Sequence, residues 1–145
     1  MVARAKRAIR DTLTSRLKNV NSQLGELNRE LAGQMIKLAA QTGDSASLIE
    51  AVQALKKAKT YYQVEDAPQE AMEVQQALAD TLLSLGKKAN DKNALSHAVQ
   101  AYRNAITLAS LIGDEDRRNA LKSNYRVAQK LLGEHRETQS LFKVA

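Results

Sequence analysis

Apolar residues recur along this chain at steps of three and four, the spacing that places one apolar stripe on an α-helix. Two short polar breaks, Gly43-Asp44-Ser45 and Asn90-Asp91, interrupt the spacing. Gly or Asn can adopt the left-handed conformation that ends a helix, and Asp or Ser can cap the next one. Each break therefore predicts a tight turn between two antiparallel helices.

Two further breaks separate these hairpins, at Asp66-Ala67-Pro68 and at Gly113-Asp114-Glu115-Asp116. Pro suits the first turn of a helix, and acidic residues are stabilised at its positive end. The pattern as a whole predicts helices near residues 3–42, 45–63, 67–89, 92–112, 115–133 and 136–143.

A shift of 47 residues superimposes the two hairpins on each other. Leu31-Ala32 falls on Leu78-Ala79, and Ala51-Val52-Gln53-Ala54 falls on Ala98-Val99-Gln100-Ala101. We therefore divide the chain into a basic amphipathic segment, residues 1–30, that begins a long first helix; two hairpins and a half repeat, residues 31–134; and a short C-terminal capping helix, residues 135–145.

The second hairpin resembles the tetratricopeptide repeat (TPR), and a weaker match in the same phase lies one repeat earlier. The residues that carry the resemblance are Leu85, Gly86, Ala98, Tyr102 and Ala105, and then Leu38, Ala39, Ala51, Leu55 and Ala58. TPR units are about 34 residues long, so a 47-residue period implies longer hairpins. The resemblance implies an all-α fold of antiparallel hairpins, stacked as a short right-handed TPR-like solenoid with a long N-terminal helix.

The resemblance also implies a binding surface, because the first helices of such hairpins line a concave groove that holds a peptide or helix of another protein. The expected groove positions are Ile36, Lys37, Ala40, Leu83, Ser84, Lys87, Asn90, Lys130, Leu131 and Glu134. Chaperone-binding members clamp a terminal carboxylate at some of these positions. Only Lys130 fits that clamp, so we do not expect it here. The chain's own ends could also cover such a groove.

A narrow seam of larger apolar residues runs along the first predicted helix, formed by Leu13, Leu17, Val20, Leu24, Leu27 and Leu31. Steps of four and three are typical of a helix that packs along one partner helix. We expect the chain's own following helices to cover this seam. A second copy of the chain, or another protein or membrane surface, is the alternative.

The net charge of +6 is concentrated at the N-terminus. Against Asp11 alone stand six cations, Arg4, Lys6, Arg7, Arg10, Arg16 and Lys18. They make this segment a candidate contact for phosphates of nucleic acid or for an anionic membrane. The alternative is a solvated helix face.

No combination of residues predicts catalysis, a cofactor, a metal ion or a small-molecule substrate. The chain has no cysteine, and its two histidines have no acidic or histidine partner one helical turn away. Asp114-Glu115-Asp116 is interpreted as a capped first turn. No apolar run approaches the ~20 residues that span a bilayer. We therefore expect a non-enzymatic cytoplasmic interaction module or scaffold, with self-assembly into a homo-oligomer as an alternative.

Overall fold

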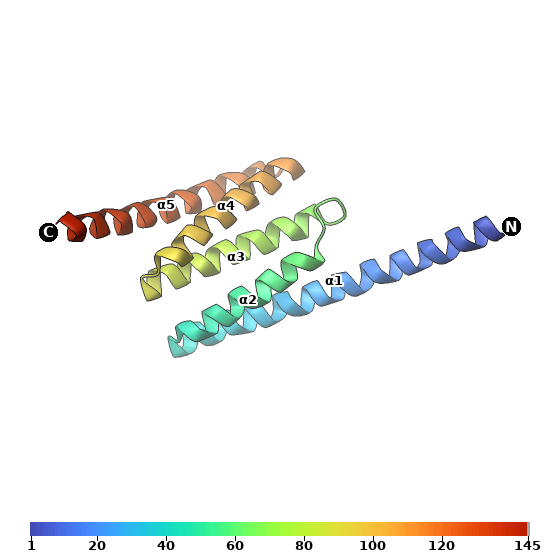
Figure 1. Cartoon of the computed structure of the whole chain (residues 1–145), viewed down its shortest axis with the longest axis horizontal. Helices are drawn as coiled ribbons and strands as arrows, with labels where there is room; N and C mark the ends of the chain where they lie inside the picture. The colour runs from blue at the N-terminus through green and yellow to red at the C-terminus, as the bar shows by residue number, and fades with distance from the viewer. Residues whose placement is uncertain (145) are drawn as a thin grey trace.

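The computed structural model describes the backbone of residues 1–144 and the side chains of residues 1–134, and it is all-α over that part. The helices are α1 (Val2–Thr42), α2 (Ser45–Tyr61), α3 (Pro68–Ala89), α4 (Lys92–Ile112) and α5 (Glu115–Val144). Each helix packs against the next one along the chain. Helices α1, α3 and α5 run in one direction and α2 and α4 run back, while the N-terminal half of α1 projects beyond the other helices (Figure 1).

The predicted turns are confirmed in their local geometry. Gly43 and Asn90 end α1 and α3 in the left-handed conformation, with φ of 71° and 50°. Asp44 and Asp91 cap α2 and α4, because the Asp44 carboxylate accepts from the backbone N–H of Ala46 and the Asp91 carboxylate accepts from those of Asn93 and Ala94. Between the hairpins, Pro68 opens α3 as the sequence predicts.

The core is made of Leu and Ala, with small residues where two helices come closest. A Cβ added to Gly86 would lie 2.6 Å from Leu95 Cδ2, so α3 and α4 touch where the chain has no side chain. Ala98, Ala105 and Tyr102 are fully buried on α4. Small residues therefore allow α3 and α4 to approach each other closely in the second hairpin.

The end of the chain differs from the prediction. Helix α5 continues through Gly133 to Val144, so the break near residue 133 and the separate helix at 136–143 are wrong. Gly133 does not take a positive φ. A glycine inside a helix costs only about 1 kcal/mol relative to alanine, which is too little to end a helix without a cap. The side chains of residues 135–145, including any capping role, lie outside the described residues.

Candidate interaction surfaces

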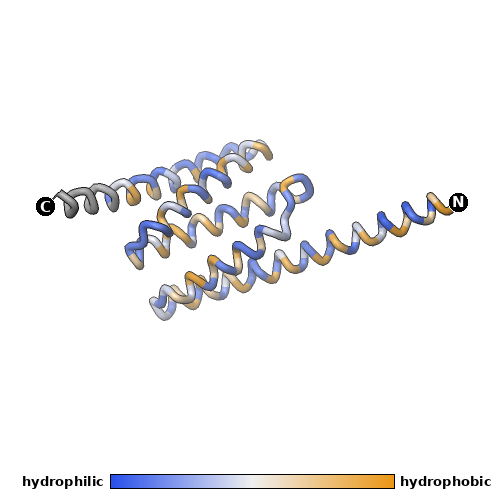
Figure 2. The backbone as a smooth tube through the Cα atoms, viewed as in Figure 1, coloured by the Kyte–Doolittle hydropathy of each residue, from blue (hydrophilic) through white to orange (hydrophobic). Residues whose placement is uncertain are grey.

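The apolar seam on α1 is open to solvent. Leu13, Leu17 and Leu27 are 57%, 61% and 60% exposed. Val20 and Leu31 are also exposed, and Leu24 is half-buried. Figure 2 shows apolar residues alternating with polar ones along the projecting part of α1. We call Leu13, Leu17, Val20, Leu24, Leu27 and Leu31 the α1 stripe. The prediction that the following helices cover this stripe is wrong.

The α1 stripe stays exposed because α2 packs on a different face of α1. The buried residues of α1 are small, namely Gly25, Ala32 and Ala39, spaced seven apart. At 100° per residue they lie about 100° around the helix from the stripe. Small residues let the helix axes approach closely, and a Cβ at Gly25 would meet the Tyr62 ring at 2.5 Å. The seven-residue spacing of these small residues is the feature of the sequence that could have indicated the packed face.

Two ion pairs hold α1 on the side away from the stripe. Arg29 donates to Glu73 of α3 at 2.9 Å, and both side chains are about two-thirds buried. Lys18 lies 3.4 Å from Asp66 in the connection between α2 and α3, where both groups are exposed. The body of the protein thus lies against one side of α1, and the α1 stripe faces another.

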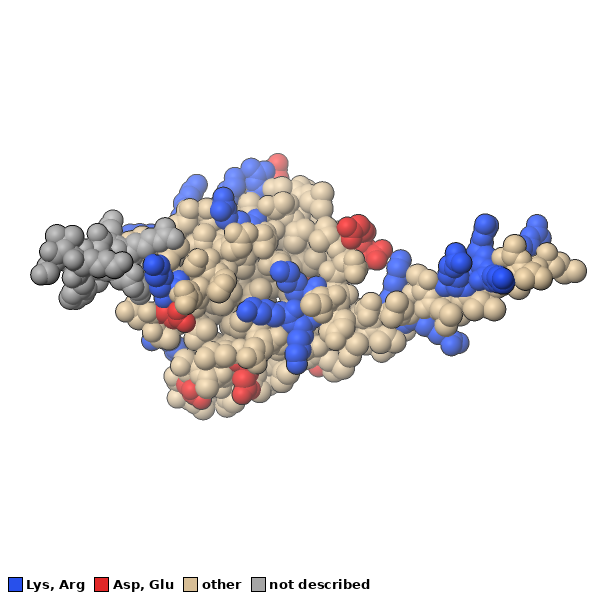
Figure 3. All heavy atoms as spheres, in the orientation of Figure 1, with Lys and Arg blue, Asp and Glu red and all other residues tan. Residues whose placement is uncertain are grey.

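The six N-terminal cations are all exposed. Blue side chains are spread over the projecting part of α1 in Figure 3. Of these cations, Lys18 alone forms an ion pair within the described part of the chain. Arg4, Lys6, Arg7, Arg10 and Arg16 therefore stay available to an external anion.

The residues predicted to form a groove lie on α1, α3 and α5, with Asn90 directly after α3, towards the same end of the molecule (Figure 1). Leu83 belongs to the core and is only 9% exposed, so it offers little surface to a partner. Among the others Leu131 is half-buried, and the exposed ones are Ile36, Lys37, Ala40, Ser84, Lys87, Asn90, Lys130 and Glu134. The exposed set is mostly polar, and the groove remains a prediction.

One basic surface was not predicted from the sequence, because its residues are far apart along the chain. A hollow of about 420 Å³ between α4 and α5 is lined by Arg103, Lys122 and Arg126, together with Tyr125 and Gln129. No Asp or Glu lies between residues 117 and 133. This absence of acidic residues over several helical turns is the feature of the sequence that could have indicated the basic surface.

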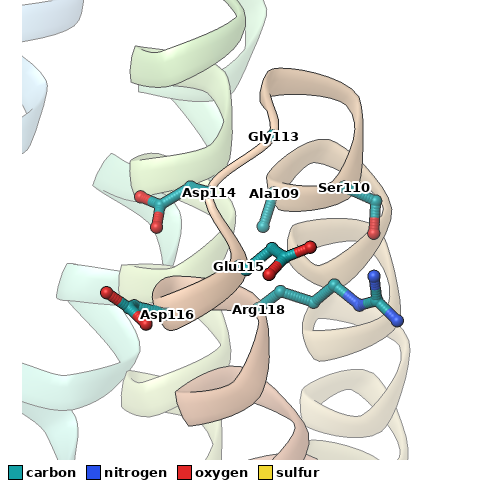
Figure 4. A pocket seen from close by; sticks show the side chains of 7 residues that line it. All are labelled: Ala109, Ser110, Gly113, Asp114, Glu115, Asp116 and Arg118. Atoms are coloured by element: carbon teal, nitrogen blue, oxygen red, sulfur yellow. The ribbon is translucent and has the colours of Figure 1, made fainter.

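The acidic run at the start of α5 is a helix cap. Asp114 accepts from the backbone N–H of Arg117 at 3.0 Å. The three carboxylates around the neighbouring hollow do not converge on one point, since Glu115 lies on the side of Arg118 and Asp114 and Asp116 point away from it (Figure 4). Among the described residues, no group of three His, Asp or Glu side chains could hold a metal ion.

One titratable pair is partly buried inside the second hairpin. Tyr102 donates to Asp80 at 2.5 Å across the contact between α3 and α4. Burial raises the pKa of Asp80, and the hydrogen bond from Tyr102 offsets only part of that rise. Burial also raises the pKa of Tyr102. Both effects favour neutral groups, which suits a structural contact.

Comparison with protein families, with curated proteins and with solved structures found no match to this chain. Over the described residues, no helix combines the length and the apolar character that crossing a membrane requires.

Proposed function

We propose that this protein is a non-enzymatic protein-interaction and scaffolding module, with the α1 stripe as its main contact surface. Its hairpins form a TPR-like right-handed solenoid that holds α1 in place and leaves half of it free. The observation that carries the proposal is the exposure of five large apolar residues in one row on a helix.

A contiguous apolar row of this kind is costly in water. Each fully buried Leu contributes about 1.5–3 kcal/mol relative to an exposed one, and contiguous exposed apolar surface of this kind typically marks an interaction site. The polar groove between α1, α3 and α5 offers less apolar surface, since Leu83 lies in the core. The α1 stripe is therefore the better supported of the two surfaces.

A photo-crosslinking amino acid at position 27, introduced in living cells, tests the α1 stripe directly. We expect a discrete crosslinked protein from this position, because Leu27 is 60% exposed in the centre of the stripe. The matched control is position 111 on α4, where Leu111 is 66% exposed and lies away from the stripe. Equal crosslinking at both positions, or none at position 27, would refute the proposal.

A second candidate function is binding of nucleic acid or of an anionic membrane by the projecting cations, which their exposure favours. Such binding weakens steeply as salt rises, since it releases counterions. The variant Arg7→Glu with Arg10→Glu should then abolish binding of the purified chain to duplex DNA or to anionic vesicles. Binding that is insensitive to both salt and these substitutions would remove this candidate.

A further inference from the structure

The α1 stripe has a pattern that is complementary to itself in the reverse direction. We infer that α1 pairs with α1 of a second copy of this chain as an antiparallel two-helix contact centred between Val20 and Leu24. This inference rests on the proposed function, since it names the partner of the same surface.

The register follows from the spacing of the stripe. When the two helices run in opposite directions, Leu13 faces Leu31 of the second copy, Leu17 faces Leu27, and Val20 faces Leu24. Every apolar residue of the stripe then meets an apolar residue, in six consecutive layers. Alternating steps of four and three keep such layers on one seam.

The charges favour this direction over the parallel one. Lys6 and Arg10 continue the seam towards the N-terminus, at steps of seven from Leu13 and Leu17. A parallel pair would place each of these cations against the same cation of the second copy. It would also bring together two N-terminal segments that each carry a net charge of +5. In the antiparallel pair, Lys6 faces Leu38 and Arg10 faces Gln34 of the second copy.

The flank of the seam adds a complementary pair. Arg16 and Glu30 lie on the side of the stripe away from α2, and both are exposed. In the antiparallel register the Arg16 side chain of one copy flanks the same layers as Glu30 of the other. Opposite charges at such flanking positions set the partner and its direction.

The rest of the molecule leaves room for this contact. Helix α2 packs on Gly25, Ala32 and Ala39, about 100° around α1 from the stripe. Glu73 and Asp66 approach α1 through Arg29 and Lys18, which lie still further from the stripe. A second helix can therefore lie on the stripe while every observed contact of α1 is kept.

Sedimentation velocity on the purified chain, from low to high micromolar concentration, tests the pairing. We expect a reversible dimer, and we expect Leu17→Glu with Leu27→Glu to weaken it more than about 100-fold, because two of the six apolar layers, with four leucines, are lost. The matched control Leu111→Glu should leave it unchanged. Circular dichroism checks that each variant keeps its helices. A wild-type chain that stays monomeric at high micromolar concentration would overturn the inference.

Engineered cysteines test the direction, because the natural chain has none. Under oxidation, an equal mixture of Leu17→Cys and Leu27→Cys should give a disulfide-linked dimer of the two variants. Neither variant alone should give a disulfide-linked dimer, since positions 17 and 17 lie far apart in the antiparallel register. Crosslinking of the single variants with themselves would instead show a parallel pair and refute the register.

The two proposals fail in different ways. A monomeric chain whose position 27 crosslinks to a different protein in cells would refute the second copy as partner and keep the α1 stripe as the contact surface. A monomeric chain with no crosslink at position 27 would refute both.

Discussion

Asp91 shows how a single side chain can begin a helix directly after the preceding helix has ended at Asn90. Its carboxylate accepts from the backbone N–H groups of Asn93 at 2.9 Å and Ala94 at 3.3 Å. These donors have no carbonyl partner within α4, because the first turn of a helix leaves its N–H groups unpaired. The cap therefore stabilises the turn that folds α4 back on α3.

We predict that Asp91→Ala lowers the free energy of unfolding by about 1 kcal/mol, since it removes this cap. Asp91→Asn is the matched control, because an amide oxygen can accept the same two hydrogen bonds. Urea denaturation of the three proteins measures the difference. Equal losses for both variants would show that the charge, and not the hydrogen bonds, is what stabilises the turn.

The pair Asp80 and Tyr102 predicts a dependence on pH. Burial raises the pKa of Asp80 in the folded protein above its unfolded value. The folded state therefore binds this proton more tightly than the unfolded state does. The contribution of the bound proton to the free energy of unfolding is lost as pH rises through the raised pKa. Asp80→Asn removes the titration but keeps an oxygen that accepts from Tyr102.

We expect Asp80→Asn to gain stability relative to the natural chain as pH rises from about 3 to 7. Thermal unfolding of both proteins across this range measures the difference. In contrast, Tyr102→Phe should cost roughly 1 kcal/mol at pH 7, because Asp80 loses its donor. An Asp80→Asn protein that loses stability relative to the natural chain over this range would contradict the direction of the pKa shift.

At the scale of helices, small residues decide which faces pack. Gly86 lies against Leu95 so closely that an added Cβ would fall 3.3 Å from the Leu95 backbone nitrogen. Gly33 on α1 has nothing within 4 Å of the same position. The close contact with Leu95 therefore requires a glycine at position 86. At position 33 no contact requires one, and glycine only weakens the helix.

We therefore predict opposite effects of the same substitution at these two sites. Gly86→Ala should destabilise the protein by about 1–3 kcal/mol, since α3 and α4 must move apart. Gly33→Ala should stabilise it by about 0.5–1 kcal/mol through helix propensity. Equilibrium urea denaturation gives both values. A Gly86→Ala chain as stable as the natural one would show that the hairpin adjusts without cost.

At the scale of the whole molecule, α1 has two halves with different support. The C-terminal half buries Gly25, Ala32 and Ala39 against the α2 side of the body, whereas residues 1–20 are exposed throughout. A helical segment without tertiary contacts is marginally stable in water. Under the pairing proposed above, the stability of the projecting half depends on the second copy, whereas the stability of the body does not.

Hydrogen exchange measures this dependence. In dilute solution we expect amides of residues 2–17 to exchange quickly and amides of α3 to be protected, since α3 lies in the core. At high concentration the antiparallel pair should slow exchange in residues 2–17 and leave α3 unchanged. Exchange in residues 2–17 that does not depend on concentration would contradict the pairing.

Local features of this fold were predictable from the sequence. The positions of the turns follow from Gly43, Asn90 and the capping Asp residues, because each acts on backbone groups a few residues away. The end of α5 was not predictable in this way, because Gly133 alone does not distinguish a helix end from a helix interior.

The sequence by itself determined that the chain is helical, where four of its helices begin and end, and that α1 carries one apolar seam. Only the tertiary structure decided that this seam is open, because two faces of α1 compete for α2 and close packing favours the small residues Gly25, Ala32 and Ala39 over the leucines. It also decided that Leu83 lies in the core and that cations of α4 and α5 share one hollow. These outcomes depend on how distant segments pack together, and the spacing within one helix does not contain that information.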